Sequence, residues 1–248
     1  MSTAFEKVKS YFRNRKIYKA LRQNPLLSKI NQHYRNQAEA QKRESVHTYG
    51  LESLLLTKES FAEIKRDFWL DYGTLLGAIR DKDFIGHDAD IDVGTFFTGN
   101  EDAKKFENAM KKRGFEKSRE FWMDGNIVEE TYIRKGVNLD VFYYYSEGEK
   151  DKIHCFTLEE GEHTVYQKLD EYTLVTGLSV KKVTSTFSNT TLIDFKGKQF
   201  PVPENHHEYL TDNYGPTYMI KDENWNFGEQ DIPILPFQDN TRALLFNK

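Results

Sequence analysis

The fold is decided by two neighbouring stretches, Tyr72-Gly-Thr-Leu-Leu-Gly-Ala-Ile-Arg80 and Ile85-Gly-His-Asp-Ala-Asp-Ile-Asp-Val93. The first predicts a turn at Gly73-Thr74 followed by a short helix that ends at Arg80. The second alternates apolar and acidic residues, which is typical of a strand. Because residues i and i+2 of a strand face the same side, Asp90 and Asp92 should present two carboxylates side by side.

Two close carboxylates repel each other unless a cation lies between them, and hard oxygen ligands suit Mg²⁺ or Mn²⁺. Asp140 is the best candidate for a third ligand, because it interrupts the apolar strand predicted over 137–145. An ionised group inside a sheet is costly unless it is paired or bound to metal. The pattern predicts a site at which Asp90, Asp92 and Asp140 hold two divalent ions, Mg²⁺ or Mn²⁺.

The segment before the aspartates is suited to binding phosphate. Gly73 permits close approach of the backbone, Thr74 offers a hydroxyl donor, and the helix after them directs free N–H groups at an anion. Arg80 adds a planar set of donors that matches phosphate geometry. His87 either hydrogen-bonds a phosphate or caps its loop.

Each of these features has an ordinary structural explanation when it stands alone. An Asp-x-Asp pair is usually a solvated turn, Asp140 would pair with a lysine, and Arg80 would form a surface ion pair. The combination is far more specific. A glycine turn, a short helix, an Asp-x-Asp strand and a later lone aspartate on a strand together predict a nucleotidyltransferase-like core.

At these residues the chain resembles the LicD/fukutin family of phosphotransferases. The matching residues are Gly73-Thr-Leu-Leu-Gly-Ala-Ile-Arg80, Asp88-Ala-Asp-Ile-Asp-Val93 and Asp140, with a weaker echo in Val202-Pro-Glu-Asn-His-His-Glu-Tyr-Leu-Thr-Asp-Asn-Tyr-Gly215. The resemblance covers roughly residues 45–228. It implies a substrate-binding role for Asp88 beside Gly73, Thr74, Arg80 and His87.

The resemblance also implies a reaction. Family members transfer a phospho-alcohol unit, such as phosphocholine, ribitol phosphate or glycerol phosphate, from a CDP-linked donor to a sugar hydroxyl, and CMP leaves. Many members have Pro-Trp-Asp-Asp-Asp-Ile-Asp where this chain has Gly86-His-Asp-Ala-Asp-Ile-Asp92. The departure keeps the metal-binding pair and leaves the identity of the donor open.

The rest of the chain predicts an α/β fold, with a mixed twisted sheet flanked by helices and a β-rich second half. Helices are expected over 4–23, 27–44 and 45–66, short strands over 153–202, a helix over 206–213 and an irregular C-terminal stretch. We divide the chain into a basic helical extension, 1–44, and a catalytic domain, 45–248. The extension either packs on the core or meets anionic lipid headgroups. Liposome binding with and without residues 1–44 distinguishes the two.

Composition restricts the class of protein. Aromatic residues make up 14% of the 248 residues, which is enough for a core despite 30% charged residues, and the net charge of -4 favours no nucleic-acid partner. The single cysteine, Cys155, excludes an intrachain disulfide. Without a secretory signal or an apolar run of membrane-helix length, we expect a cytoplasmic protein, peripheral on the inner membrane face where lipid-linked glycan acceptors are built.

Three hypotheses for function follow. The leading one is metal-dependent transfer of a phospho-alcohol to a cell-surface glycan. The first alternative is a true nucleotidyltransferase that moves a nucleoside monophosphate onto a small molecule or protein with the same aspartates. The second is a protein that only binds glycan or nucleotide, although a binding module has no need for three clustered carboxylates.

Overall fold

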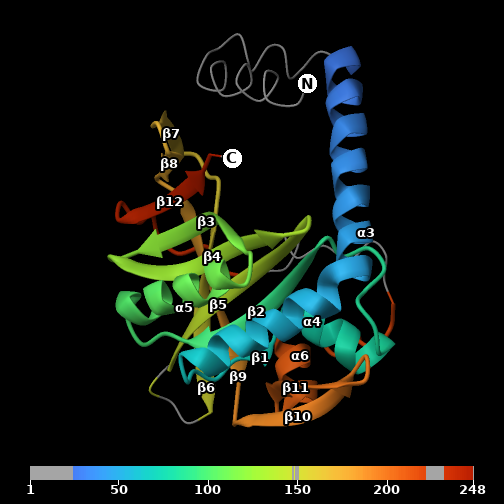
Figure 1. Ribbon diagram of the computed structural model, residues 1–248. Helices are drawn as coiled ribbons and strands as arrows, with labels where there is room; N and C mark the ends of the chain where they lie inside the picture. The colour runs from blue at the N-terminus through green and yellow to red at the C-terminus, as the bar shows by residue number, and fades with distance from the viewer. Residues whose placement is uncertain (1–24, 147, 149–150, 222–231, 248) are drawn as a thin grey trace.

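The computed structural model describes residues 25–146, 148, 151–221 and 232–247 (Figure 1). Its helical elements are α3 (Pro25–Glu63), α4 (Tyr72–Leu76), the π-helical turn η1 (Gly77–Asp81), α5 (Asn100–Lys112) and α6 (His206–Tyr214). Its strands are β1 (Trp69–Leu70), β2 (Asp90–Phe96), β3 (Glu116–Met123), β4 (Asn126–Arg134), β5 (Val137–Ser146), β6 (Lys152–Glu159), β7 (Val165–Lys168), β8 (Tyr172–Thr176), β9 (Ser179–Thr186), β10 (Thr190–Phe195), β11 (Lys198–Pro203) and β12 (Thr241–Phe246).

Ten of these strands form one mixed sheet. Its main path runs β1-β2-β5-β4-β3-β12-β8-β7, with β6 and β9 joined through β5, while β10 and β11 form a separate hairpin. The pair β2–β5 is parallel, and the other pairs are antiparallel. The predicted α/β class, with a mixed twisted sheet and a β-rich second half, is therefore confirmed.

The two faces of the central strands differ in polarity. Ile91 on β2 and Leu139 on β5 are fully buried on the face that α3 and α5 cover. Gly50 of α3 lies against Ile91, and Phe106 of α5 stacks on Phe61 of α3. Since neighbouring residues of a strand face opposite sides, the acidic residues of β2 and β5 lie on the other face, where α4 packs.

The helices predicted over 27–44 and 45–66 are one helix, α3, so the proposed domain boundary falls inside a continuous element. Figure 1 shows a bend between the N-terminal part of α3 and the part that crosses the sheet. Ser45 Oγ donates to the carbonyl of Gln41 at 2.9 Å, a bond that bends helices without ending them. Residues 1–24, including the helix predicted over 4–23, lie outside the described residues.

Two further expectations are wrong. Gly73 and Thr74 do not form a turn before the helix but lie in the first turn of α4, because Asp71 caps that helix by accepting the Tyr72 N–H at 2.8 Å. The C-terminal stretch is not all irregular. β12 pairs with both β3 and β8 inside the main sheet, which supplies the backbone partners that its sequence does not reveal.

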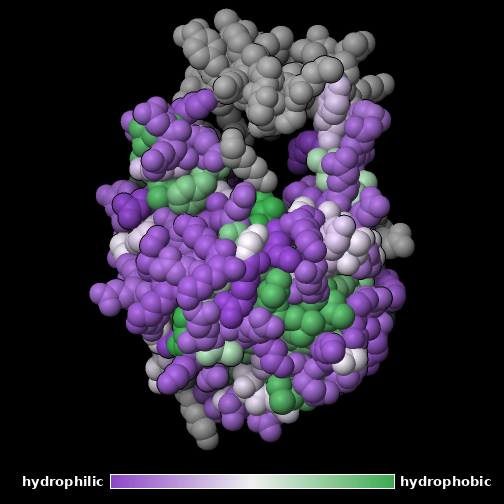
Figure 2. All heavy atoms as spheres, viewed as in Figure 1, coloured by the Kyte–Doolittle hydropathy of each residue, from purple (hydrophilic) through white to green (hydrophobic). Residues whose placement is uncertain are grey.

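The remaining elements agree with the sequence. The strand predicted over 137–145 is β5, and the Lys135-Gly136 turn that joins β4 to it has positive φ at both residues, as a tight hairpin requires. The helix predicted over 206–213 is α6. None of the described helices is long and apolar enough to span a membrane. Figure 2 shows a mainly hydrophilic face, with apolar side chains gathered where α3 crosses the sheet.

Candidate phosphate and metal site

β2 and β5 bring three aspartates together on the face away from α3 and α5. Asp92 and Asp140 are paired in register on parallel strands, and Asp90 lies one strand repeat earlier, opposite Asn138. The expected grouping of Asp90, Asp92 and Asp140 on one side of the sheet is therefore seen. Ligation of metal by these residues stays a prediction.

Burial and mutual repulsion make it unfavourable for the grouped carboxyls to be ionised at the same time. Burial, followed by the charges of Asp140 and Asp88, raises the pKa of Asp90 to about 7. Burial, and then Asp90 and Asp140, also raise the pKa of Asp92 well above its ordinary value. A cation placed among these groups would relieve both penalties, because it stabilises the charged form of each carboxylate.

The donor atoms fit Mg²⁺ or Mn²⁺, although Asp140 is engaged elsewhere. Its Oδ1 accepts hydrogen bonds from Thr131 Oγ1 and from Arg119 Nη2, the latter at 3.5 Å. Across the described ranges, no three His, Cys, Asp or Glu side chains are arranged as a ligand set for one ion. Ligation by all three aspartates therefore requires Asp140 to leave Arg119. No ion pair of the described residues competes in this way for Asp90 or Asp92.

The first turn of α4 fixes the strand that carries the acids. The Asp92 N–H donates to Thr74 Oγ1 at 2.9 Å, and the Asp71 N–H donates to the Asp92 carbonyl at 3.1 Å. Thr74 is buried, so its hydroxyl holds β2 in place, and the structure does not present it to solvent as a free phosphate donor. The substrate-binding role expected of Thr74 stays a prediction.

Gly73 is required by its closeness to the acidic residues. A Cβ on Gly73 would overlap Asp88 Oδ2 and would lie 3.6 Å from Asp92 Oδ2. Gly73 and Asp88 also line a cavity of about 100 Å³ beside the aspartates. The remaining lining residues come from α4, η1, the following loop, the last residue of α6 and the segment after it: Leu76, Arg80, Ile85, His87, Tyr214, Thr217, Tyr218 and Ile220.

The two basic residues expected at this site differ in their freedom. Arg80 pairs with Asp81 at 2.9 Å and donates to the Tyr218 carbonyl at 3.3 Å, so part of its donor capacity is already used. His87 is half exposed, with Nε2 3.9 Å from Asp88 Oδ1. The structure thus brings both to the cavity with Gly73 and Asp88, and it leaves their roles toward a ligand as predictions.

Comparison with known proteins places this geometry in a family. The sequence model described as "LicD/FKTN/FKRP, nucleotidyltransferase domain" matches residues 65–205, which is more than half of the chain. The chain belongs to the LicD/FKTN/FKRP family. It is also similar to human "Ribitol-5-phosphate transferase FKTN", at 27% identity over 189 residues. That alignment covers 75% of this chain but 36% of the human protein, about a third of its length.

The part that matches the LicD/FKTN/FKRP family contains every site residue expected from the sequence and leaves out both α3 and α6. α6 nevertheless completes the cavity. Burial, and then the charges of Asp92 and Asp88, raise the pKa of Tyr214 well above its ordinary value, which places its hydroxyl near the acidic group. The weaker family resemblance over residues 202–215 therefore includes a residue of the site, Tyr214.

Two charged residues of this LicD-family site were not expected from the sequence. Arg119 on β3 donates from Nε to Thr131 at 3.1 Å and reaches Asp140. Glu129 on β4 is buried, and burial together with Asp140 raises its pKa to about 8 against the opposing charge of Arg119. Strand alternation could have indicated Glu129. It lies two residues before Thr131, which pairs with Asp140, so the side chains of Glu129 and Thr131 face the same side of the sheet.

Proposed function

We propose that this chain transfers a phospho-alcohol unit from a CDP-linked donor to a hydroxyl of a cell-surface glycan. The product is a phosphodiester, and CMP is released. The observation that carries the proposal is the group of Asp90, Asp92 and Asp140 on adjacent parallel strands, next to the cavity lined by Gly73 and Asp88. Family membership and the name of the human relative, a ribitol-5-phosphate transferase, support this substrate class, and they favour ribitol phosphate as the first unit to test.

The reaction needs one bond made and one bond broken. The acceptor hydroxyl oxygen attacks the phosphorus that carries the alcohol, and the bond from that phosphorus to the oxygen shared with CMP breaks. CMP leaves with the electron pair. The hydroxyl proton passes to a carboxylate, and Asp140 is the candidate acceptor because Arg119 and Thr131 hold it in place at the edge of the group.

Asp90 and Asp92 are proposed to hold Mg²⁺ or Mn²⁺. Such ions, when bound, neutralise diphosphate charge and stabilise the leaving oxygen. The chain's own contribution is to orient the carboxylates through Thr74 and Asp71, and to offer Arg80 and His87 at the cavity. The acceptor is proposed to be a lipid-linked oligosaccharide at the inner membrane face.

Mass spectrometry of products tests the proposal. The purified chain is incubated with Mg²⁺ or Mn²⁺ and with CDP-ribitol, CDP-glycerol, CDP-choline, CTP or ATP, in the presence of sugar acceptors. We expect metal-dependent CMP from one CDP-alcohol. The variant Asp90→Ala/Asp92→Ala should lose activity by at least about 10³-fold, since it removes the proposed metal ligands.

Two outcomes would contradict the proposal. Pyrophosphate released from CTP or ATP would identify a true nucleotidyltransferase, the alternative that agrees with the name of the matching domain. Equal CMP production by Asp90→Ala/Asp92→Ala and the unmodified chain would separate the activity from this site. A donor screen without turnover is followed by calorimetry, and a chain that binds none of the donors is not a CDP-alcohol transferase.

A further inference from the structure

The N-terminal part of α3 approaches the acidic site from outside the region that matches the family. Ser45 lies against Gly136, at the turn that leads into β5, and Gly50 lies against Phe84 and Ile91. Ile91 is the residue between Asp90 and Asp92. α3 therefore passes the ends of β2 and β5 at which the acidic residues begin.

The side of α3 that faces the site continues beyond these contacts. Within residues 32–44 every side chain is exposed except Glu39 and Lys42, which are partly covered. These two lie one helical turn apart and in line with the fully buried Val46. Lys42 is therefore on the inward side of the helix, one turn before its contact with the sheet.

Arg43 lies on the same inward part of α3, because it is three residues before the buried Val46 and seven before Gly50, which packs against Phe84 and Ile91. The charges of Lys42 and Arg43 act on Asp90 and Asp88 together with those of Arg119 and Arg80. The four cations around the site are thus supplied by α3, η1 and β3.

These cations differ in how much hydrogen-bonding capacity remains. Arg80 is paired with Asp81, and Arg119 bonds Thr131 and Asp140. Lys42 has one weak ion pair, to Glu39 at 3.6 Å, and Arg43 has none among the ion pairs of the described ranges. A lysine and an arginine with unused donors, next to a site for a divalent ion, match a ligand that carries several negative charges.

We propose that Lys42 and Arg43 of α3 bind the diphosphate of the donor, so that a helix outside the family-wide domain completes the substrate site. The proposal rests on the proposed function, which supplies a diphosphate ligand. Under this proposal, two residues of the predicted N-terminal extension contact the substrate.

Calorimetry on the full chain in Mg²⁺ tests this, with CDP, CMP and inorganic pyrophosphate as probes. Lys42→Ala/Arg43→Ala should bind CDP and pyrophosphate about tenfold more weakly and CMP only about threefold more weakly, since two charge-assisted bonds are lost. Lys42→Arg/Arg43→Lys keeps both charges and should stay within about threefold of the unmodified chain.

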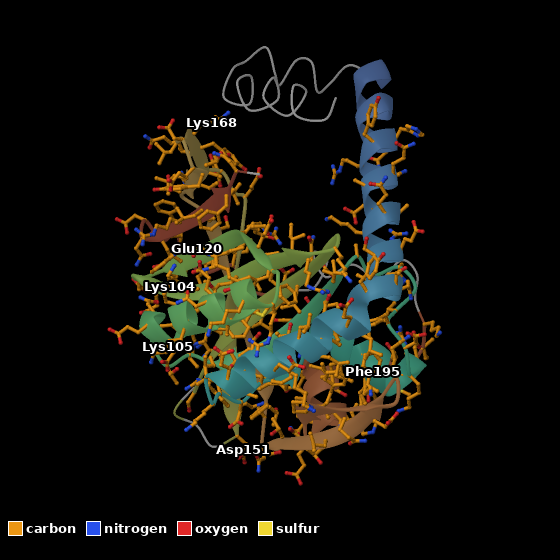
Figure 3. The ribbon with its side chains drawn as sticks, viewed as in Figure 1. Lys104, Lys105, Glu120, Asp151, Lys168 and Phe195 are labelled. Carbon is orange, nitrogen blue, oxygen red and sulfur yellow. The ribbon has the colours of Figure 1, made fainter. Side chains whose placement is uncertain are left out.

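The matched control is Lys104→Ala/Lys105→Ala. These adjacent residues on α5 are similarly charged, and their side chains are 64% and 63% exposed. Figure 3 shows them on α5, away from the N-terminal part of α3. The control changes net charge equally and should leave all three affinities unchanged, which separates a local contact from the overall field of the protein.

The outcomes separate the inference from the function. If the unmodified chain turns over a CDP-alcohol and Lys42→Ala/Arg43→Ala binds CDP within twofold of it, the inference is wrong and the function stands. If no CDP compound binds but pyrophosphate binding is lost in Lys42→Ala/Arg43→Ala alone, the diphosphate contact stands and the donor is wrong. If neither probe binds the unmodified chain, both are wrong.

Discussion

Gly73 is the residue at which local packing and site chemistry meet most directly. In Gly73→Ala the new methyl group would displace the Asp88 carboxylate, which is the mobile end of a side chain, so the backbone of α4 need not move. Alanine also favours helix by about 1 kcal/mol over glycine. We therefore expect a melting temperature within about 3 °C of the unmodified chain, but turnover reduced by about 10- to 100-fold through misplacement of the site.

Gly86→Ala is the matched control for this prediction. Gly86 lies in the loop next to His87, and a Cβ there would meet no atom within 4 Å. Its activity with the CDP-alcohol identified in the donor screen should stay within about twofold, since its substitution displaces nothing. Equal kinetic constants for Gly73→Ala and Gly86→Ala would show that the position of Asp88 does not matter for turnover.

The site was predictable at the residues that strand alternation governs. Asp90, Asp92 and Asp140 were expected to face one side, and the register of β2 and β5 places them there. Arg119 was not predictable, because the pairing of β3 with β4 shifts between Lys117 and Arg119. A bulge of this kind changes which face a side chain occupies, and no signal in the sequence marks it.

At the level of elements, α6 is tied to the acidic site through a buried carboxylate. The hydroxyls of Tyr209 on α6 and Tyr144 on β5 donate to Asp71 at 2.8 and 2.7 Å, and they lie 2.8 Å from each other. All three residues are fully buried. Asp71 also caps α4, so a single carboxylate connects α6, β5 and the helix that contains Gly73.

Tyr209→Phe tests that connection. It removes one donor from a buried carboxylate and should lower stability by about 1–3 kcal/mol, a melting temperature decrease of roughly 3–10 °C. Differential scanning calorimetry measures it against Tyr172→Phe, which removes a hydroxyl from the partly exposed Tyr172 on β8. If the two variants melt together, the bond from Tyr209 to Asp71 adds nothing to stability.

The elements that were predicted wrongly from the sequence have a common physical cause. The two helices expected over 27–44 and 45–66 are continuous, since neither Ser45 nor Gly50 ends a helix that is packed against the sheet. The strand β12 was missed because its place depends on β3 and β8, which are more than sixty residues away in sequence. Periodicity describes local contacts, and long-range pairing overrides it.

On the scale of the whole molecule, two groups of carboxyls oppose each other in their response to pH. Hydrogen bonds from Arg134 and Lys135 lower the pKa of Glu52 to about 2, so its contribution to stability is present above its ordinary pKa and is lost as pH falls. Burial raises the pKa values of Asp71 and Asp88 to about 6, that of Asp90 to about 7 and that of Glu129 to about 8. These four favour the folded state at low pH.

The second group should dominate between pH 5 and 8 in the absence of divalent ions. Each of its members has a pKa near 4 in the unfolded chain, so the folded state binds more protons in this range and the free energy of unfolding falls as pH rises. The fully buried Asp71 alone accounts for about 3 kcal/mol, which is fully present below pH 4 and lost as pH rises through 6.

In EDTA we expect the melting temperature to fall by about 5 °C or more from pH 5 to pH 8. Mg²⁺ should restore more of it at pH 8 than at pH 5, because only ionised carboxylates bind the ion. Asp90→Asn/Asp92→Asn should remove the response to Mg²⁺ and make the profile shallower, with the slope due to Asp71, Asp88 and Glu129 remaining. A melting temperature that rises from pH 5 to pH 8 in EDTA would show that the carboxylates at this site do not carry the charge penalty that makes it a place for a cation.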